Sequence, residues 1–212
     1  MTQWEHSRMH IEFLVEESSA EAALRNIVPQ ILGGSATYDI HPHQGKRDLL
    51  SKLPQRLRAY RKWMPDDWRI VVLVDADDED CKALKAQLEE AAREAGFITK
   101  SAASSSRGFQ VLNRVVMKEL EAWFLGDVEA IRAAYPDVPQ TLARKAPYRD
   151  PDAVAGGAWE ALERVLQKAG YHRGGLDKIA AAREISEHMR PERNRSNSFR
   201  AFCEGLRALV GQ

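Results

Sequence analysis

Cysteine is scarce in this 212-residue sequence, which holds only Cys81 and Cys203. The two lie far apart, and neither has a second Cys or a His beside it at the spacing of zinc ligands. The pattern therefore indicates neither a disulfide framework nor a zinc site, and both residues are expected to be ordinary buried thiols.

Long hydrophobic runs are also missing. No apolar stretch approaches the roughly 18 residues that are needed to cross a bilayer, which argues against a transmembrane helix. The opening residues MTQWEHSRMH lack the basic and then apolar pattern of a signal peptide. We therefore expect the chain to stay in the cytoplasm and to have no membrane partner.

The sequence has no surplus of one charge, because 31 basic and 31 acidic residues give a formal net charge of zero. This balance argues against a protein that coats nucleic acid by electrostatics alone, which needs a large basic surplus. The charges are unevenly distributed, since residues 1–135 carry a net charge of −3 and residues 136–212 a net charge of +3. An acidic first part could hold a metal ion while a basic tail contacts phosphate.

Short apolar segments alternate with amphipathic helical patterns along the first part of the chain. The run WRIVVLV is typical of a parallel strand that is covered on both faces. Strands that alternate with helices imply crossover connections, so we predict an α/β fold with a mainly parallel sheet sandwiched by helices. The expected strands are 9–15, 36–40, 68–74 and 109–117, with a weaker one at 97–100. A long helix after the second strand should bend or split at Pro54.

The chain changes character beyond Tyr135, where proline, glycine and arginine become common and only helical patterns remain. Helices are predicted roughly at 159–169, 179–189 and 199–210. We therefore predict an α/β metal-binding domain over residues 1–136 and a helical C-terminal subdomain over residues 137–212.

Acidic residues follow three of the predicted strands. Glu16 follows the first strand, Asp75 and Asp77 follow the central one, and Glu121 follows the last, with Glu119 beside it. Ligands of an open parallel sheet bind outside the carboxyl ends of its strands, because loops converge there and helix N-termini point at the ligand. Carboxylate oxygens without neighbouring Cys or His pairs favour Mg²⁺ or Mn²⁺. The sequence therefore predicts a divalent-metal site at this edge of the sheet.

The adjoining residues Asp78, Glu79 and Asp80 have a simpler explanation, since acidic residues commonly precede a helix and favour its positive N-terminal dipole. An EF-hand is argued against by Asp80, which stands where that loop requires glycine. A phosphatase of the haloacid dehalogenase type would need Gly-Thr after its Asp-x-Asp, and neither residue follows here. His41 and His43 could turn to one face of an extended segment, but two loop histidines without further ligands are left out of the predicted site.

Two segments place acidic residues directly after apolar strands, namely FLVEESSAEAAL at 13–24 and VVLVDADD at 71–78. This combination resembles the Toprim fold, the metal-dependent catalytic domain of topoisomerases, bacterial primases and related nucleases. Gly45-Lys46 before a helix, KELEAWFLGD at 118–127 and RNRSNSF at 193–199 are similar to a bacterial domain-of-unknown-function family, number 4276, within the Toprim clan. The resemblance to that family runs over nearly the whole chain, and its members are often encoded beside an AAA-type ATPase.

The resemblance implies roles for several acidic residues. Glu16 would be a metal ligand or general base, and Asp75 and Asp77 would hold Mg²⁺. Glu121 would complete a second metal site, and a pair of ions can activate water and stabilise the leaving oxygen of a phosphodiester. Glu17 departs from the pattern, because related nucleases usually have glycine at that position.

Two groups of basic residues could contact phosphate. Lys118, near the last acidic strand end, could stabilise negative charge that develops during catalysis. Arg193, Arg195 and Arg200 cluster around the segment 196–198 and could bind nucleic acid. The alternative for these arginines is a solvated turn in which Ser198 caps the last helix.

The leading hypothesis is a divalent-metal-dependent phosphodiester hydrolase, a Toprim-type DNA or RNA endonuclease that acts with an ATPase partner in phage defence. The alternative is a non-catalytic regulatory or nucleic-acid-binding subunit of such an ATPase complex. A homo-oligomer is compatible with both. Cleavage of nucleic acid in Mn²⁺ would separate the two hypotheses.

Overall fold

The computed structural model describes residues 9–104 and 108–211 of the chain. Its centre is a four-stranded, all-parallel sheet with the strand order β2-β1-β3-β4. The strands are β1 (His10–Val15), β2 (Thr37–Pro42), β3 (Trp68–Asp75) and β4 (Val111–Val116). The predicted α/β class with a mainly parallel sheet is confirmed.

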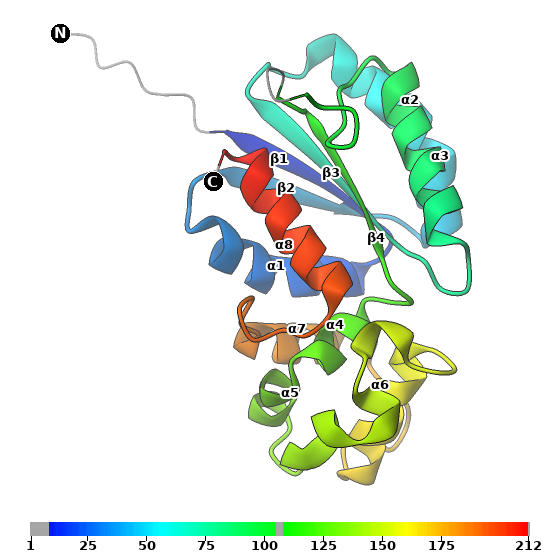
Figure 1. Ribbon diagram of the computed structural model, residues 1–212, viewed down its shortest axis with the longest axis vertical. Helices are drawn as coiled ribbons and strands as arrows, with labels where there is room; N and C mark the ends of the chain where they lie inside the picture. The colour runs from blue at the N-terminus through cyan, green and yellow to red at the C-terminus, as the bar shows by residue number, and fades with distance from the viewer. Residues whose placement is uncertain (1–8, 105–107, 212) are drawn as a thin grey trace, which may run out of the picture.

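Helices cover both faces of this sheet (Figure 1). One face packs against α1 (Ser18–Leu32) and α8 (Asn197–Leu209), and the other packs against α2 (Lys46–Trp63) and α3 (Cys81–Glu94). The alternation of side chains along β1 explains the division, because Phe13 packs on the α1 side and Leu14 on the α2 side. Both side chains are fully buried, as expected of a strand that is covered on both faces.

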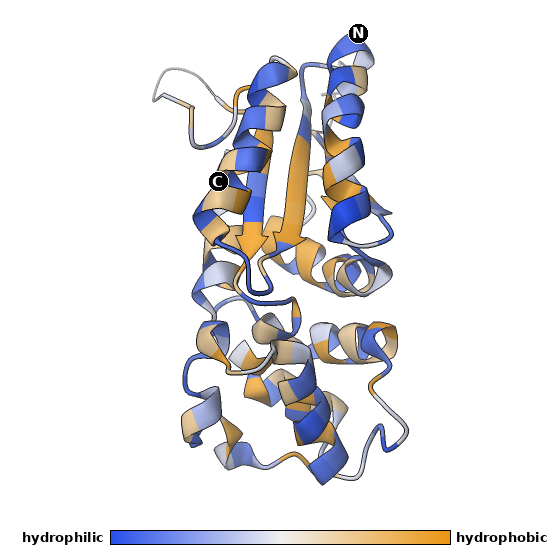
Figure 2. Ribbon diagram, turned by 90° about the vertical axis from the view of Figure 1, so that its right-hand side faces the viewer, coloured by the Kyte–Doolittle hydropathy of each residue, from blue (hydrophilic) through white to orange (hydrophobic). Residues whose placement is uncertain are grey.

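A second group of helices lies beyond the carboxyl ends of the strands, and we call it the helical lobe. Figure 2 shows the strand arrowheads directed toward it. The edge at which parallel sheets bind ligands therefore faces the helical lobe. The lobe consists of α4 (Glu121–Gly126), α5 (Val128–Ala134), α6 (Ala158–Lys168), α7 (Lys178–His188) and the short 3-10 helices Gln140–Arg144, Ala146–Tyr148 and Pro151–Ala153.

One hydrophobic core runs through the sheet and the helical lobe. Trp123 of α4 packs against Phe199 and Phe202 of α8, with ring centroids 5.1 and 5.0 Å apart. The same cluster of buried side chains includes Phe13 of the sheet and Leu162 of α6. The division into residues 1–136 and 137–212 stays a prediction, and α8 from the second segment completes the cover of the sheet.

The weak strand expected at 97–100 is reduced to a single bridge between Thr99 and Val111. The cause lies in the preceding turn, where the Phe97 amide still donates to the carbonyl of Ala92 at the end of α3. This helix-end hydrogen bond leaves too few extended residues to form a strand.

Two further features concern the boundaries of the helices. α2 runs through Pro54 without a break, because Leu49, Leu53 and Leu57 are buried against the sheet on both sides of the proline. The segment after β4 is divided into α4 and α5 at Asp127, whose side chain accepts from the amide of Ala130 and starts a new helix.

The last helix is capped by Ser196 rather than by Ser198. Ser196 Oγ accepts from the amide of Phe199 at 3.0 Å, whereas Ser198 Oγ accepts from the Trp123 indole at 3.0 Å. The described residues contain no helix that has both the length and the apolar character to cross a membrane. Cys203 is buried as predicted, while Cys81 is partly exposed.

Candidate metal centre at the sheet edge

Glu16 directly follows β1 and lies at the carboxyl end of the sheet. Its Oε1 accepts a hydrogen bond of 2.7 Å from the backbone amide of Asp75, the last residue of β3. The side chain is 8% exposed, and burial is the main reason why the pKa of Glu16 rises to about 7. Two predicted ligands from separate strands therefore meet at one edge.

Asp75 connects this edge to the helical lobe. Its Oδ2 accepts from the amide of Leu120, just before α4, at 3.2 Å. Burial raises the pKa of Asp75 well above its usual range, and the negative charges of Glu16 and then Glu121 raise it further. The pKa of Asp75 therefore responds to the charge of a glutamate on either side of it in the sequence.

Glu121 is the first residue of α4 and is 3% exposed. Burial raises its pKa to about 7, while the ammonium of Lys178 lowers it. We call Glu16, Asp75 and Glu121 the carboxylate cluster. A divalent cation would offset their mutual repulsion, and Mg²⁺ and Mn²⁺ prefer oxygen donors of this kind. Among the described residues the ligand atoms of these three do not all lie within 4.8 Å of one another, so binding of one ion by all three would need the side chains to move closer together.

Two lysines flank the carboxylate cluster. Lys46, at the start of α2, donates to Asp77 Oδ2 at 2.5 Å and to Glu79 Oε1 at 2.8 Å. Lys178, at the start of α7, lies 3.9 Å from Glu121 Oε1, and its ammonium lies 5.2 Å from the ring centroid of Trp159. The cluster therefore has a cation on the sheet side and another on the lobe side.

A family model for a domain of unknown function, DUF4276, matches residues 15–207. The chain belongs to this family. The DUF4276 segment contains Glu16, Asp75 and Glu121, so the whole carboxylate cluster lies within it. No curated protein and no solved structure shows significant similarity to the chain.

Asp77 lies beside the carboxylate cluster of this DUF4276 protein rather than inside it. Its side chain is 51% exposed and is paired with Lys46. Its backbone has a left-handed φ of 51°, an uncommon conformation for a residue other than glycine. The charge of Asp77 still raises the pKa of Glu16 and of Asp75, and its role as a metal ligand stays a prediction.

The other charged residues of this region have partners of their own. Lys118 pairs with the exposed Asp78 at 2.8 Å. Asp80 caps α3 by accepting from the amide of Lys82 at 2.8 Å, as the simpler explanation predicted. Glu119 accepts from the two amides at the start of α6, those of Ala158 and Trp159, at 2.7 and 2.9 Å. Lys118 as a catalytic cation stays a prediction.

The three C-terminal arginines hold DUF4276 loops together. Arg193 forms two hydrogen bonds, of 2.7 and 2.9 Å, with the buried carboxylate of Asp127. Arg195 donates to the backbone carbonyls of Arg149, Leu125 and Tyr148. Arg200 donates to the carbonyl of Asn194 at 2.9 Å. Their role in nucleic-acid binding stays a prediction, and these contacts give each of them a structural role.

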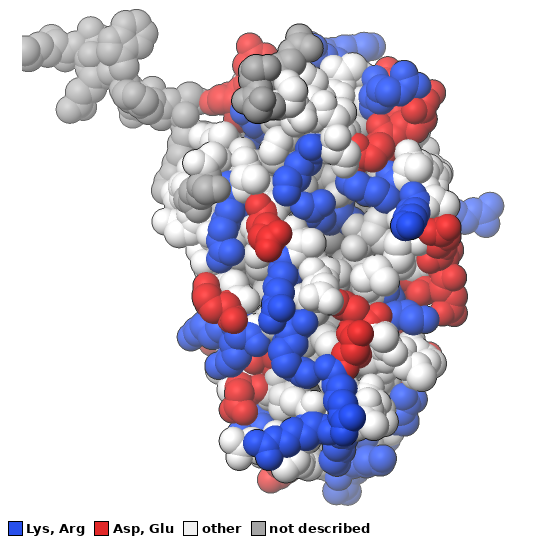
Figure 3. Space-filling view, in the orientation of Figure 1, with Lys and Arg blue, Asp and Glu red and all other residues white. Residues whose placement is uncertain are grey.

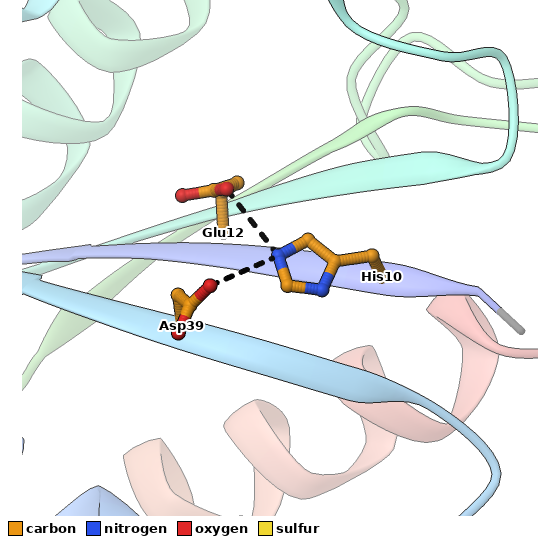
Figure 4. A group of neighbouring side chains, drawn as sticks. All are labelled: His10, Glu12 and Asp39. Atoms are coloured by element: carbon orange, nitrogen blue, oxygen red, sulfur yellow. Dashed lines mark hydrogen bonds and ion pairs between the residues drawn. The ribbon is translucent and has the colours of Figure 1, made fainter.

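A second group of candidate ligands lies at the other end of the sheet. Within residues 9–104 and 108–211, His10, Glu12 and Asp39 form the group whose ligand atoms all lie within 4.8 Å of one another (Figure 4). Sequence reasoning missed this group, although alternating polar residues in an otherwise apolar β1 were a usable signal. Lys178 was also missed, because no local pattern connects residue 178 to the sheet.

Proposed function

We propose that this protein is a divalent-metal-dependent phosphodiester hydrolase of Toprim type that acts on DNA or RNA. The observation that carries the proposal is the convergence of Glu16, Asp75 and Glu121, which come from three distant segments of the chain. They meet at the ligand-binding edge of a parallel sheet, and burial raises the pKa of each.

The residues of the carboxylate cluster are positioned for this chemistry by the backbone. Glu16 and Asp75 each use one oxygen to accept from a backbone amide, which leaves their other oxygens for Mg²⁺ or Mn²⁺. The chemistry that such bound ions supply is activation of water and stabilisation of the leaving oxygen. The ammonium groups of Lys46 and Lys178 would balance part of the charge of a phosphate bound at the site.

A surface groove of about 530 Å³ is lined by Lys46 and Asp77. Lys46 and Asp77 belong both to the groove and to the surroundings of the carboxylate cluster. Arg47 adds a donor for a sugar-phosphate backbone. Figure 3 shows further basic side chains that follow one another down one face of the molecule, which would extend the contact with a polyanion.

The test is cleavage of supercoiled plasmid and of single-stranded RNA by the purified chain in Mn²⁺. We expect cleavage by the unchanged protein and a loss of at least about 100-fold in Asp75→Asn, because the substitution removes a ligand charge without changing shape. Asp66→Asn is the control, since Asp66 is an exposed acid in the turn before β3 and away from the carboxylate cluster. Equal cleavage by the two variants would show that the carboxylate cluster is not the active site.

The second candidate is a non-catalytic regulatory or nucleic-acid-binding subunit of an ATPase complex. It is favoured by the contacts of Arg193, Arg195 and Arg200 with groups of the protein itself, which leave fewer of their donors for a substrate. The expected partner in both cases is an AAA-type ATPase, and the expected setting is phage defence. Binding of nucleic acid without cleavage, alone and with the ATPase and ATP, would favour this second role, and self-association of the chain can be measured in the same samples.

A further inference from the structure

The group of His10, Glu12 and Asp39 lies on the sheet at the end opposite to the carboxylate cluster. His10 and Glu12 are two residues apart on β1, and Asp39 is the register partner of Glu12 on β2. Alternate residues of a strand and register partners of parallel strands share a face, so all three side chains project to the same side (Figure 4). Their proximity follows from the fold and needs no special loop.

The distances within this group match a small tetrahedral ion. His10 Nε2 lies 3.3 Å from Glu12 Oε1 and 3.6 Å from Asp39 Oδ2. Ligand atoms at zinc–nitrogen and zinc–oxygen bond lengths of about 2.0–2.1 Å are separated by roughly 3.3 Å in a tetrahedron. Both distances from His10 are close to this value, and the oxygens of Glu12 and Asp39 lie within 4.8 Å of each other.

Glu12 is held in place from its far side. Its Oε2 accepts from Tyr60 at 3.0 Å and is bonded to His41 Nε2, so Oε1 is the oxygen that remains directed at His10. Glu12 is 5% exposed. Such an arrangement, in which a second set of residues orients a ligating carboxylate, is common around metal ions in proteins.

His10 is oriented by contacts on both sides of its ring. Its Nδ1 lies 2.8 Å from Thr37 Oγ1, and the ring packs 4.2 Å from the ring centroid of Trp68. The Thr37 hydroxyl donates to the carbonyl of Met9 at 3.5 Å, which leaves its oxygen to accept from Nδ1–H. The lone pair of His10 Nε2 then faces two carboxylate oxygens, which is an arrangement that a cation satisfies.

We propose that His10, Glu12 and Asp39 bind a divalent transition-metal ion, with Zn²⁺ as the ion that best fits one imidazole and two carboxylates. The fourth position is open to water, because the Asp39 side chain is 71% exposed. The ion links the edge strand β2, through Asp39, to β1, through His10 and Glu12. The site is independent of the proposed hydrolase activity, and His10 and Glu12 lie before the segment that the family model matches.

The experiment uses the full chain without a polyhistidine tag. Zinc binding is measured by calorimetry, and Co²⁺ is used as a spectroscopic probe whose visible absorption reports a tetrahedral site. We expect one high-affinity zinc ion per chain and a thermal unfolding midpoint that rises with zinc concentration. His10→Gln and Asp39→Asn should each weaken zinc binding by about tenfold or more. Asp39→Asn changes an exposed side chain, so its fold should be preserved.

The matched controls are His188→Gln on α7 and Asp66→Asn in the turn before β3, which remove one histidine and one acid elsewhere. Asp75→Asn should also keep zinc affinity, which separates this site from the carboxylate cluster. The proposal is overturned if zinc does not bind the unchanged chain, or if binding persists equally in His10→Gln and Asp39→Asn.

Discussion

Glu16 and Glu121 have pKa values that are raised to about 7 by burial. A carboxyl group with a raised pKa in the folded state binds its proton more tightly there, so it stabilises the fold fully below its ordinary pKa of 4.5. This contribution is lost as the pH rises through about 7, and it amounts to on the order of 2–3 kcal/mol for each group.

We therefore expect the metal-free protein, in EDTA, to lose stability between about pH 5 and about pH 8. Urea unfolding measures the effect, and the difference between the unchanged chain and Glu16→Gln isolates the part that belongs to Glu16. Millimolar Mn²⁺ should oppose the loss at the upper end of the range. Glu16→Gln should lose less stability than the unchanged chain, so the difference between the two should grow as the pH rises, and a difference that does not change with pH would contradict the buried carboxylate.

Asp127 is also a buried acid, but both of its carboxylate oxygens accept hydrogen bonds. It is 1% exposed and accepts from Ala130 at the start of α5, from the Arg190 amide and from both donors of Arg193. Asp127→Ala should lower the free energy of unfolding by about 2–3 kcal/mol, because it leaves the amides of Ala130 and Arg190 without their partner and removes the ion pair with Arg193. Glu129→Ala, an exposed acid on the same helix, should change it by less than about 0.5 kcal/mol in the same urea titration.

Single residues differed in how well the sequence predicted them. Glu16, Asp75 and Glu121 could be found because each follows an apolar strand, and the carboxyl ends of parallel strands meet at one edge. Lys178 could not be found, since its distance from Glu121 depends on how α7 docks against α1. The pairing of Asp77 with Lys46 likewise depends on the left-handed backbone of Asp77, which the sequence does not indicate.

At the scale of elements, the end of α4 packs closely against the loop before α8. A Cβ atom on Gly126 would lie 2.1 Å from Asn194 Oδ1 and 3.1 Å from the amide nitrogen of Ser196. Asn194 cannot move aside without loss, because it is fully buried and bonds to the Trp123 carbonyl and to the Ser196 amide. Close approach of these two segments therefore requires glycine at position 126.

Gly126→Ala should destabilise the protein by about 1–3 kcal/mol through overpacking. Gly174→Ala is the matched control, because a Cβ atom there meets open space. Thermal unfolding of the two variants measures the difference. Equal midpoints for the two variants would mean that α4 and this loop can separate at little cost.

The strands and most helices could be predicted from hydrophobic periodicity, because each has a face that the core requires to be apolar. The segment at 97–100 could not be predicted in this way, since the Phe97 amide bonds to the carbonyl of Ala92 at the end of α3 and the strand is shortened. The unbroken α2 shows a similar competition. There, burial of leucines on both sides of Pro54 outweighed a local preference to break the helix.

At the scale of the whole molecule, the helical lobe places a lysine ammonium beside the carboxylates at the edge of the sheet. Lys178 on α7 lies 3.9 Å from Glu121, and the charges of Glu121, Glu17, Glu119 and Asp75 raise the pKa of its ammonium. The packing of α7 on α1 thus brings the ammonium of Lys178 close to carboxylates that come from earlier segments of the chain.

Lys178→Met should make the protein more dependent on a divalent cation. Without the ammonium, the carboxylate cluster loses part of its compensation, so Mn²⁺ should raise the unfolding midpoint more than it does in the unchanged chain. The gain corresponds to about 2–4 °C for each kcal/mol of added stabilisation. Lys168→Met, at the exposed end of α6, should respond as the unchanged chain does. Identical responses of the two variants would exclude an electrostatic role for Lys178.

The position of α8 constrains when the fold can close during synthesis. This helix, residues 197–209, covers the sheet face that holds Leu112 and Val116. A ribosome must therefore have released nearly all of the DUF4276 segment before that face is shielded. Until then, Leu112 and Val116 of β4 stay uncovered in the nascent chain, and exposed apolar side chains of this kind are what chaperones bind.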